Sequence, residues 1–332
     1  MALLAVSCTP ASAPTTTPDA TNTEVTPEGT TPAPTPSTLT VFAMKGPTGI
    51  GMAPIYSDAA AGKTFDTYNF TIAANAQEKL SDLIAGNFDI ASVPTNLAAT
   101  LAKKAPGVYK IAAVNTLGVL YVLDSTDTVK SVQDLKGKKI YATGEGQVPQ
   151  FALEFVLEKN GLKVGTDVEI EYLADASDVG KLVIAGSAEI AMLPQPYVTQ
   201  VSAKAEKAKV ALDITEEWDK VADEGSRLMT SCILINAKTY ANNKEAVERF
   251  MAEFRKSVTF VNENTKEAAD KVVEAGIVAD AGLAEKAIPK CNIVCVEGDE
   301  MKTSLRVFYE AIFAVNPQLV GGQVPTDEIY LA

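Results

Sequence analysis

The feature that most constrains the fold of this chain is an internal repeat of two short motifs. Residues 48–54 and 143–149 both read Thr-Gly-x-Gly-x-x-Pro. Residues 83–94 and 183–194 both carry Ile-Ala-Gly, then an acidic residue followed by Ile-Ala, and then a proline. The two pairs occur in the same order and at nearly the same offset along the chain. Self-similarity at a fixed offset indicates a duplicated unit, so we predict two lobes of like construction.

Short runs rich in β-branched residues alternate with helical stretches from residue 38 onward, which predicts an α/β fold. Strands separated by helices of about ten to fifteen residues are typical of parallel βαβ units with right-handed crossovers. We therefore expect both lobes to be doubly wound. The predicted strands are residues 40–44, 70–73, 90–93 and 110–114 in the first lobe, and 139–142, 169–173, 190–193 and 210–213 in the second.

After residue 213 the pattern changes to one more strand, 232–235, followed by helices. The helix at 245–262 carries its apolar residues on one face, which predicts packing against a core. A second helix, 300–315, stops before Asn316-Pro317. We assign these elements to the first lobe, so the chain crosses between the lobes twice and the crossings form a hinge. The predicted boundaries are 38–124 plus 229–332 for lobe 1 and 125–228 for lobe 2, with crossings near 123–128 and 227–231.

The first 37 residues are expected to lie outside the fold. Residues 1–8 end in a short apolar run before Cys8 and resemble the remnant of a bacterial lipoprotein signal, in which the cysteine is lipidated. Residues 9–37 hold ten Thr and seven Pro and no aromatic residue, which predicts an extended, disordered tether. We expect a protein anchored through Cys8 to the outer face of the cell membrane. The alternative is an ordinary buried cysteine.

Composition excludes several kinds of partner and chemistry. Lys plus Arg number 29 against 42 Asp plus Glu, a formal charge of −13, which argues against nucleic acid and anionic lipid as partners. Histidine is absent, which removes histidine bases, serine–histidine and cysteine–histidine catalysis, and histidine-ligated metals. We predict no cofactor and no metal site. No run of 18 apolar residues is present to span a bilayer.

The cysteines are too few for a disulfide scaffold: Cys8, Cys232, Cys291 and Cys295. Cys291 and Cys295 enclose β-branched residues that predict a strand. Four residues of strand span roughly 13 Å, which is too far for a disulfide or a shared metal. A helix would bring the two thiols closer, so that alternative stays open.

The ordered set of motifs resembles the solute-binding proteins of ABC importers, in the group that binds sulfonates, nitrate and thiamine precursors. The resemblance covers residues 38–332. It implies a type II periplasmic-binding-protein fold that closes like a Venus flytrap on one small solute and delivers it to a membrane permease. It also implies an extracytoplasmic monomer. The segments that carry the resemblance are 46–49, 83–91, 136–140, 142–144, 184–186, 194–196 and 316–325.

Candidate ligand-binding residues follow the carboxyl ends of the predicted strands, where open α/β sheets bind ligands. Glycine turns that lead into helices present backbone amides there. Glu145 opposes a bare anion, which favours a neutral or partly cationic organic solute such as a heterocycle. The predicted ligand-binding residues are Thr48, Gly49, Gly51, Thr95, Asn96, Asn115, Thr143, Gly144, Glu145, Gly146, Gln195 and Tyr197.

Structural roles compete with binding at these positions. The glycines also suit plain turns, Thr95 and Asn96 suit helix caps, and Tyr197 suits packing. Trp218, the single tryptophan, suits packing near the second crossing better than a stacking wall for a ligand ring.

Two other functions remain open beside solute binding. One is a ligand-sensing ectodomain that acts on a signalling partner, which is favoured only if no permease and ATPase are encoded nearby. The other is an enzyme, because the fungal pyrimidine-precursor synthase is similar overall. That enzyme depends on an active-site histidine and cysteines, and this chain has no histidine. We therefore predict binding without catalysis.

Overall fold

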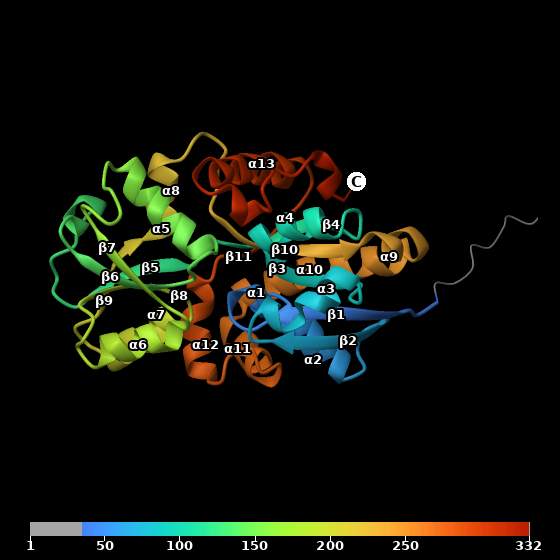
Figure 1. The fold of residues 1–332 in the computed structure, drawn as a ribbon. Helices are drawn as coiled ribbons and strands as arrows, with labels where there is room; N and C mark the ends of the chain where they lie inside the picture. Colours follow the sequence, from blue (N-terminus) through green and yellow to red (C-terminus); the bar gives the residue numbers. More distant parts are fainter. Residues whose placement is uncertain (1–34, 332) are drawn as a thin grey trace, which may run out of the picture. The chain divides into compact units, whose positions relative to one another are not determined.

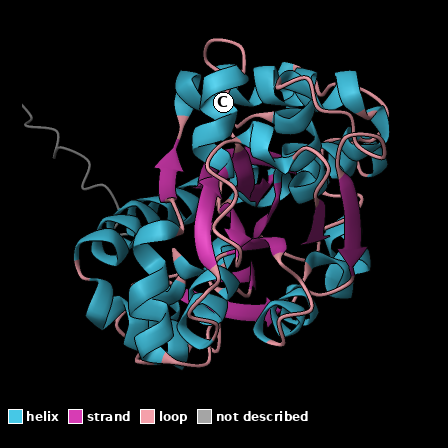
Figure 2. Ribbon diagram, turned by 90° about the vertical axis from the view of Figure 1, so that its left-hand side faces the viewer, coloured by secondary structure: helices cyan, strands magenta, loops and turns pink. Residues whose placement is uncertain are grey.

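The computed structural model describes residues 35–331. Cys8 and residues 9–34 of the predicted tether lie outside the described residues. From Pro36 onward the chain forms one compact unit that contains two β-sheets, and helices surround the strands (Figure 2). We call the six-stranded sheet with its helices lobe 1 and the five-stranded sheet with its helices lobe 2 (Figure 1).

The chain builds most of lobe 1, then all of lobe 2, and then returns to lobe 1. The first part of lobe 1 comprises β1 (Thr38–Met44), α1 (Pro47–Ile50), α2 (Ala53–Ala60), β2 (Thr67–Ala73), α3 (Leu80–Ala85), β3 (Ile90–Pro94), α4 (Thr95–Lys104) and β4 (Tyr109–Leu117). Lobe 2 comprises β5 (Leu120–Asp124), β6 (Lys139–Thr143), α5 (Val148–Lys159), β7 (Glu169–Leu173), α6 (Ala176–Ile184), β8 (Ile190–Pro194), α7 (Tyr197–Lys204), β9 (Lys209–Asp213) and α8 (Ile214–Val221). The returning part comprises β10 (Met229–Asn236), α9 (Ala237–Asn242), α10 (Lys244–Glu263), α11 (Thr265–Glu274), α12 (Ala281–Ala287), the 3-10 turn η3 (Ile288–Lys290), β11 (Ile293–Val296) and α13 (Gly298–Val315).

Sheet topology confirms the duplication. The strand orders are β11-β4-β10-β3-β1-β2 in lobe 1 and β7-β6-β8-β5-β9 in lobe 2. β1 of lobe 1 pairs in parallel with β2 and β3, and β6 of lobe 2 pairs in parallel with β7 and β8. In each lobe one antiparallel strand is inserted into the parallel set: β10 between β3 and β4 in lobe 1, and β5 between β8 and β9 in lobe 2. The inserted strand is in each case the first one formed after the chain has crossed from the other lobe.

The first crossing lies earlier than the sequence predicted. Residues 120–124 were assigned to lobe 1, but β5 is fully buried between β8 and β9 of lobe 2. Only Gly118 and Val119 separate β4 from β5, so the crossing is at these two residues and the boundary at 124 was wrong. The apolar run Leu-Tyr-Val-Leu gives a strand, and its sheet partners are distant in sequence. The second passage, residues 222–228, ends just before β10 and also lies slightly earlier than predicted.

The two lobes share a hydrophobic core on one side. Phe151 of α5 and Trp218 of α8 contact Phe308 of α13, with ring centroids 6.0 Å and 5.8 Å from it. Trp218 is completely buried and stacks on Phe155 at 4.1 Å, which confirms the predicted packing role. Three of these rings are in lobe 2 and Phe308 is in lobe 1, so we call this group the aromatic interface.

A second core lies on the other face of the lobe 1 sheet. The predicted apolar stripe of α10 is confirmed, because its large apolar side chains are buried there with those of α11 and α12. None of the helices between residues 35 and 331 has both the length and the apolar character needed to cross a lipid bilayer.

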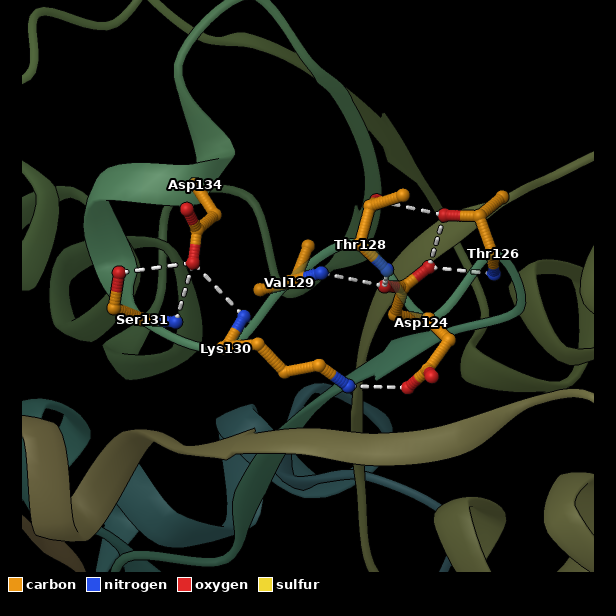
Figure 3. A network of polar contacts seen from close by, with 8 residues as sticks. Asp124, Thr126, Thr128, Val129, Lys130, Ser131 and Asp134 are labelled. Carbon is orange, nitrogen blue, oxygen red and sulfur yellow. Dashed lines mark hydrogen bonds and ion pairs between the residues drawn. The ribbon is translucent and has the colours of Figure 1, made fainter.

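The end of β5 is fixed by a polar turn (Figure 3). The Asp124 carboxylate accepts hydrogen bonds from the backbone amides of Thr126, Thr128 and Val129 at 2.7–2.8 Å. The Asp134 carboxylate accepts hydrogen bonds from the backbone amides of Lys130 and Ser131, which follow Val129 in the loop. Two carboxylates thus satisfy the amides of a loop that makes no sheet.

Candidate functional site

The candidate residues lie where the carboxyl edges of the two sheets meet. β4 of lobe 1 ends at Leu117, and the crossing leads directly to Leu120, which pairs with Pro194 at the end of β8. The first crossing therefore joins the carboxyl edge of one sheet to the carboxyl edge of the other. This is the position at which ligands bind in open α/β folds.

In lobe 1 the Thr48 loop is held by a buried polar network. The Thr48 carbonyl accepts hydrogen bonds from Ser92 Oγ and Asn115 Nδ2, both at 3.0 Å. Asn115 Nδ2 also reaches Ser92 Oγ at 2.8 Å, and Asn115 Oδ1 accepts from Ser231 Oγ at 2.8 Å. Asn115 is 2% exposed. The hydrogen bonds of its side chain are all to other lobe 1 residues, so Asn115 positions the loop in this conformation.

The two glycines of the first motif are required for close packing. A Cβ on Gly49 would lie 2.0 Å from the Met44 carbonyl oxygen. A Cβ on Gly51 would lie 3.0 Å from the side chain of Ile293, and the Gly51 carbonyl accepts a bond from Ser257 Oγ at 2.7 Å. Both residues therefore face the interior of lobe 1.

In lobe 2 the second motif is more open to solvent. Thr143 is the last residue of β6 and is buried, whereas Glu145 and Gly146 are exposed. Gly144 has a φ of 84°, and a Cβ there would meet the ring of Pro149 at 2.6 Å, so this turn requires glycine. The Gly146 amide donates to Gln150 Oε1 at 2.7 Å.

The repeated motifs superpose only in part. Pro54 and Pro149 both occupy the first turn of a helix, as predicted. Thr143 ends its strand, but Thr48 comes four residues after the end of β1, inside the short helix α1. Lobe 1 thus has an extra helical turn before its motif reaches the helix. This explains why the glycines of lobe 1 are buried and those of lobe 2 are not.

Among the candidate residues that follow β3 and β8, some are used in hydrogen bonds within the protein and others remain available to a ligand. Thr95 is fully buried and donates to the Met229 carbonyl at 2.7 Å. Asn96 is half-buried. Gln195 is 1% exposed, and its Oε1 accepts from Thr199 Oγ1 at 2.8 Å. Its Nε2 finds no hydrogen-bond partner among the described residues. Tyr197 begins α7 and is half-buried.

Charge around the site is dominated by carboxylates on the lobe 2 side. Glu145 is exposed, and Glu154 Oε1 accepts from Gln150 Nε2 at 2.8 Å and from the Tyr172 hydroxyl at 3.4 Å. Burial, and then Glu154 and Glu145, raise the pKa of Tyr172. All four arginines form ion pairs elsewhere: Arg227 with Glu300, Arg249 with Asp66, Arg255 with Glu297 and Arg306 with Asp327.

Sequence reasoning missed several residues at this site. Gln150 lies four residues after Gly146, and one helical turn of spacing is a signal that could have identified it. Tyr172, Tyr121 and Lys290 carried no such signal, because their contacts join segments distant in sequence. Tyr121 of lobe 2 donates from its hydroxyl to the Lys290 carbonyl of lobe 1 at 3.0 Å.

Two hollows of the structure are lined mostly by residues outside these loops, although Pro54 at the end of the first motif lines one of them. One, of about 310 Å³, lies between α2, α10 and α11 and is lined by Asp58, Glu253 and Lys271 among others. Another, of about 440 Å³, lies between α5 and α13, against the aromatic interface.

The described cysteines form no disulfide, and the pKa values of the thiols of Cys291 and Cys295 are raised, which disfavours the thiolate form. Burial raises the pKa of Cys291 to about 12, and burial with the Glu297 carboxylate raises that of Cys295 to about 12. Cys295 lies in β11, in agreement with the predicted strand, and Cys291 precedes that strand. From residue 35 to 331, no three Cys, Asp or Glu side chains are placed to hold a metal ion together.

Comparison with known proteins gives one family and one fold. The sequence profile of the family described as NMT1/THI5 like matches residues 71–268, more than half of the chain. A protein of Brucella abortus (strain 2308) named as a binding protein is 26% identical over 226 residues. That match covers 68% of this chain and 66%, slightly under two thirds, of the relative's own length.

Solved structures share the fold over nearly the whole described chain. A protein described as an ABC transporter from Parabacteroides distasonis has a TM-score of 0.74 at 21% identity, covering 89% of this chain and 99% of its own. The periplasmic aliphatic sulphonate binding protein of Escherichia coli has a TM-score of 0.67 at 16% identity, covering 89% and 96%. These likenesses confirm the predicted two-lobed α/β fold.

Proposed function

Because the chain belongs to the NMT1/THI5-like family, we propose that it is the solute-binding component of an ABC importer. One observation carries the proposal: the first crossing brings the carboxyl edges of two like-built sheets together, with a motif loop on each. A solute held there would contact both lobes, and bending at the crossings would close the lobes around it. The names of the relatives, a binding protein and a sulphonate binding protein, support the same class.

The solute we propose is a small organic molecule that is neutral or partly cationic. The sulphonate named for the Escherichia coli relative is an anion. In this chain every arginine is paired with a carboxylate away from the motif loops. Glu145 is exposed on the lobe 2 loop and would repel an anion. A heterocycle with hydrogen-bond donors for the Glu145 carboxylate and an acceptor for the Gln195 amide fits these groups.

The proposed contacts follow from which groups the structure leaves available. In lobe 2 they are Glu145, Gly146, Gln195 through its unpaired Nε2, and Tyr197. In lobe 1 the candidate is the half-buried Asn96, and Thr48 contributes through its loop. The remaining predicted residues support these: Asn115 and Thr95 through buried hydrogen bonds, and Gly49, Gly51, Thr143 and Gly144 through the turns they permit.

We propose binding without chemistry. A thiol with a pKa of about 12 stays protonated at neutral pH, and the thiolate is the form that attacks. The chain also lacks histidine, the side chain best suited to move protons at that pH.

The solute class is tested by thermal shift. Neutral and cationic heterocycles should raise the melting temperature of the wild type, and nitrate and small sulfonates should not. Glu145→Gln should weaken the apparent affinity for a cationic compound about tenfold, because a charge-assisted contact is lost. The matched control Glu158→Gln, an exposed glutamate on α5, should change nothing. Strong stabilisation by nitrate or a simple sulfonate alone would reverse the assignment.

The remaining parts of the proposal concern the membrane. We propose that Cys8 carries a lipid, that the protein lies outside the cytoplasm, and that its partner is an integral-membrane permease. The short apolar run before Cys8 and the Thr/Pro-rich residues that follow it support this. Partitioning of the full-length native protein into detergent is the measurement that decides the anchor, and a soluble chain with an unmodified Cys8 contradicts it.

A further inference from the structure

The lobes touch on two opposite flanks, and the two contacts differ in kind. α13 and α12 lie on opposite faces of the lobe 1 sheet (Figure 1). On the α13 flank the contact is the aromatic interface, in which Trp218 and Phe308 are completely buried. On the α12 flank the contact is made by residues 281–292, which comprise α12, η3 and the two residues that follow. We call residues 281–292 the clasp.

The clasp reaches lobe 2 through a few discrete contacts. α12 packs against α7. The Tyr121 hydroxyl of β5 donates to the Lys290 carbonyl at 3.0 Å. Tyr121 is 7% exposed, and burial together with the Asp213 carboxylate raises its pKa, so the hydroxyl keeps its proton and remains a donor.

The clasp also holds the first crossing itself. Asn292 Nδ2 donates to the Gly118 carbonyl at 2.5 Å, and the Asn292 carbonyl accepts from the Leu117 amide at 3.1 Å. Asn292 has a φ of 45°, in the left-handed region that asparagine tolerates better than most residues. This backbone turn directs both the side chain and the carbonyl of one residue at the crossing.

We propose that the clasp and Tyr121 set the balance between open and closed lobes, with the aromatic interface as the pivot. Separating the aromatic interface exposes several large apolar rings to water, which costs far more than breaking one hydrogen bond and a short helix contact. The α12 flank is therefore the one that opens. Because a solute binds the closed form, a weaker clasp lowers the apparent affinity by lowering the closed fraction. Only the effect on apparent solute affinity rests on the proposed binding function.

The test uses the protein without solute and a matched pair of variants. Tyr121→Phe removes the hydroxyl that bridges the lobes. Tyr109→Phe is the control, because Tyr109 is also 7% exposed and donates to a backbone carbonyl, that of Phe88, at 3.1 Å within lobe 1. Amide hydrogen exchange of residues 281–292 should be about fivefold faster in Tyr121→Phe, the value of one hydrogen bond, and unchanged in Tyr109→Phe. The radius of gyration from small-angle scattering should rise only in Tyr121→Phe.

A second variant and a second readout keep the proposal falsifiable. Asn292→Gly keeps the left-handed backbone, removes the bond to the Gly118 carbonyl, and should act in the same direction as Tyr121→Phe. Emission of Trp218 should stay that of a buried indole in all variants, because the pivot remains packed. Equal exchange of residues 281–292 in wild type and both clasp variants would overturn the proposal, as would a red shift of Trp218 that accompanied opening. Neither readout needs a solute, so failure of the clasp and failure of the binding function are distinguishable.

Discussion

At the scale of single residues, the structure separates groups that bind from groups that hold binding loops in place. Asn115 was a predicted ligand contact, yet its amide is fully used by Thr48, Ser92 and Ser231. Gln195 was predicted for the same reason, and its Nε2 has no hydrogen-bond partner within residues 35–331. Position after a strand was the same signal for both. Only the surrounding side chains, which come from distant segments, decide which amide is already occupied.

Asn115→Ala should test the loop-holding role. The substitution removes three buried hydrogen bonds and leaves the Ser231 hydroxyl without its acceptor, whereas Ser92 Oγ still donates to the Thr48 carbonyl, so unfolding in urea should require about 3 kcal/mol less. Asn69→Ala is the control, because Asn69 is exposed on β2 and its loss should stay within about 0.5 kcal/mol. If Asn115→Ala destabilised the protein as little as the control, the buried hydrogen bonds of Asn115 would not be what holds this loop in place.

At the scale of elements, the alternating strands and helices were predictable and the strand partners were not. Every predicted strand coincides with an observed one, because β-branched runs between helices specify an element locally. β5 was missed, and with it the position of the first crossing, because an apolar run of four residues does not reveal which sheet receives it. The repeat identified equivalent prolines at two helix starts. The Thr-Gly pairs of the two motifs are not equivalent, because Thr48 and Gly49 lie inside the extra helix α1 whereas Thr143 ends β6. The identical sequences of the motifs do not reveal this difference.

The turn after β5 should make stability depend on pH. Burial alone would raise the pKa of Asp124, but hydrogen bonds from Thr126, Val129 and Thr128 outweigh it and hold the pKa below its usual value. A depressed pKa in the folded state means that the stabilisation is complete above the unfolded value, about 3.9, and is lost as pH falls through the folded value. Asp124→Asn should therefore cost about 1–3 kcal/mol at pH 7.

The pH series supplies the check on that turn. The difference in unfolding free energy between wild type and Asp124→Asn should shrink steadily below about pH 4. Asp270→Asn, an exposed aspartate of α11, should show no such pH-dependent difference. A difference that stayed constant down to pH 2 would mean that the carboxylate charge of Asp124 does not hold the turn.

At the scale of the whole folded unit, two sheets of the same topology are joined so that each receives its inserted strand just after a crossing. The duplication thus fixes where the carboxyl edges meet, and sequence repeats were sufficient to predict that meeting. The interlobe contacts were not predictable, because Tyr121, Lys290 and Asn292 belong to no repeated motif. The motion of the lobes consequently depends on the parts of the chain in which the two lobes differ.

Gly118, in the first crossing, is closely packed against residues of lobe 2 and of the second passage, and this packing gives a prediction for the whole unit. A Cβ at Gly118 would lie 2.0 Å from Thr215 Oγ1 and 2.9 Å from Leu228. Gly118→Ala should therefore force α8 away from the crossing, cost about 1–3 kcal/mol of unfolding free energy, and enlarge the radius of gyration. Thr215→Ala removes the closest atom, so the double variant should recover part of both losses. Strictly additive effects of the two substitutions would show that the crossing does not transmit strain between the lobes through this contact.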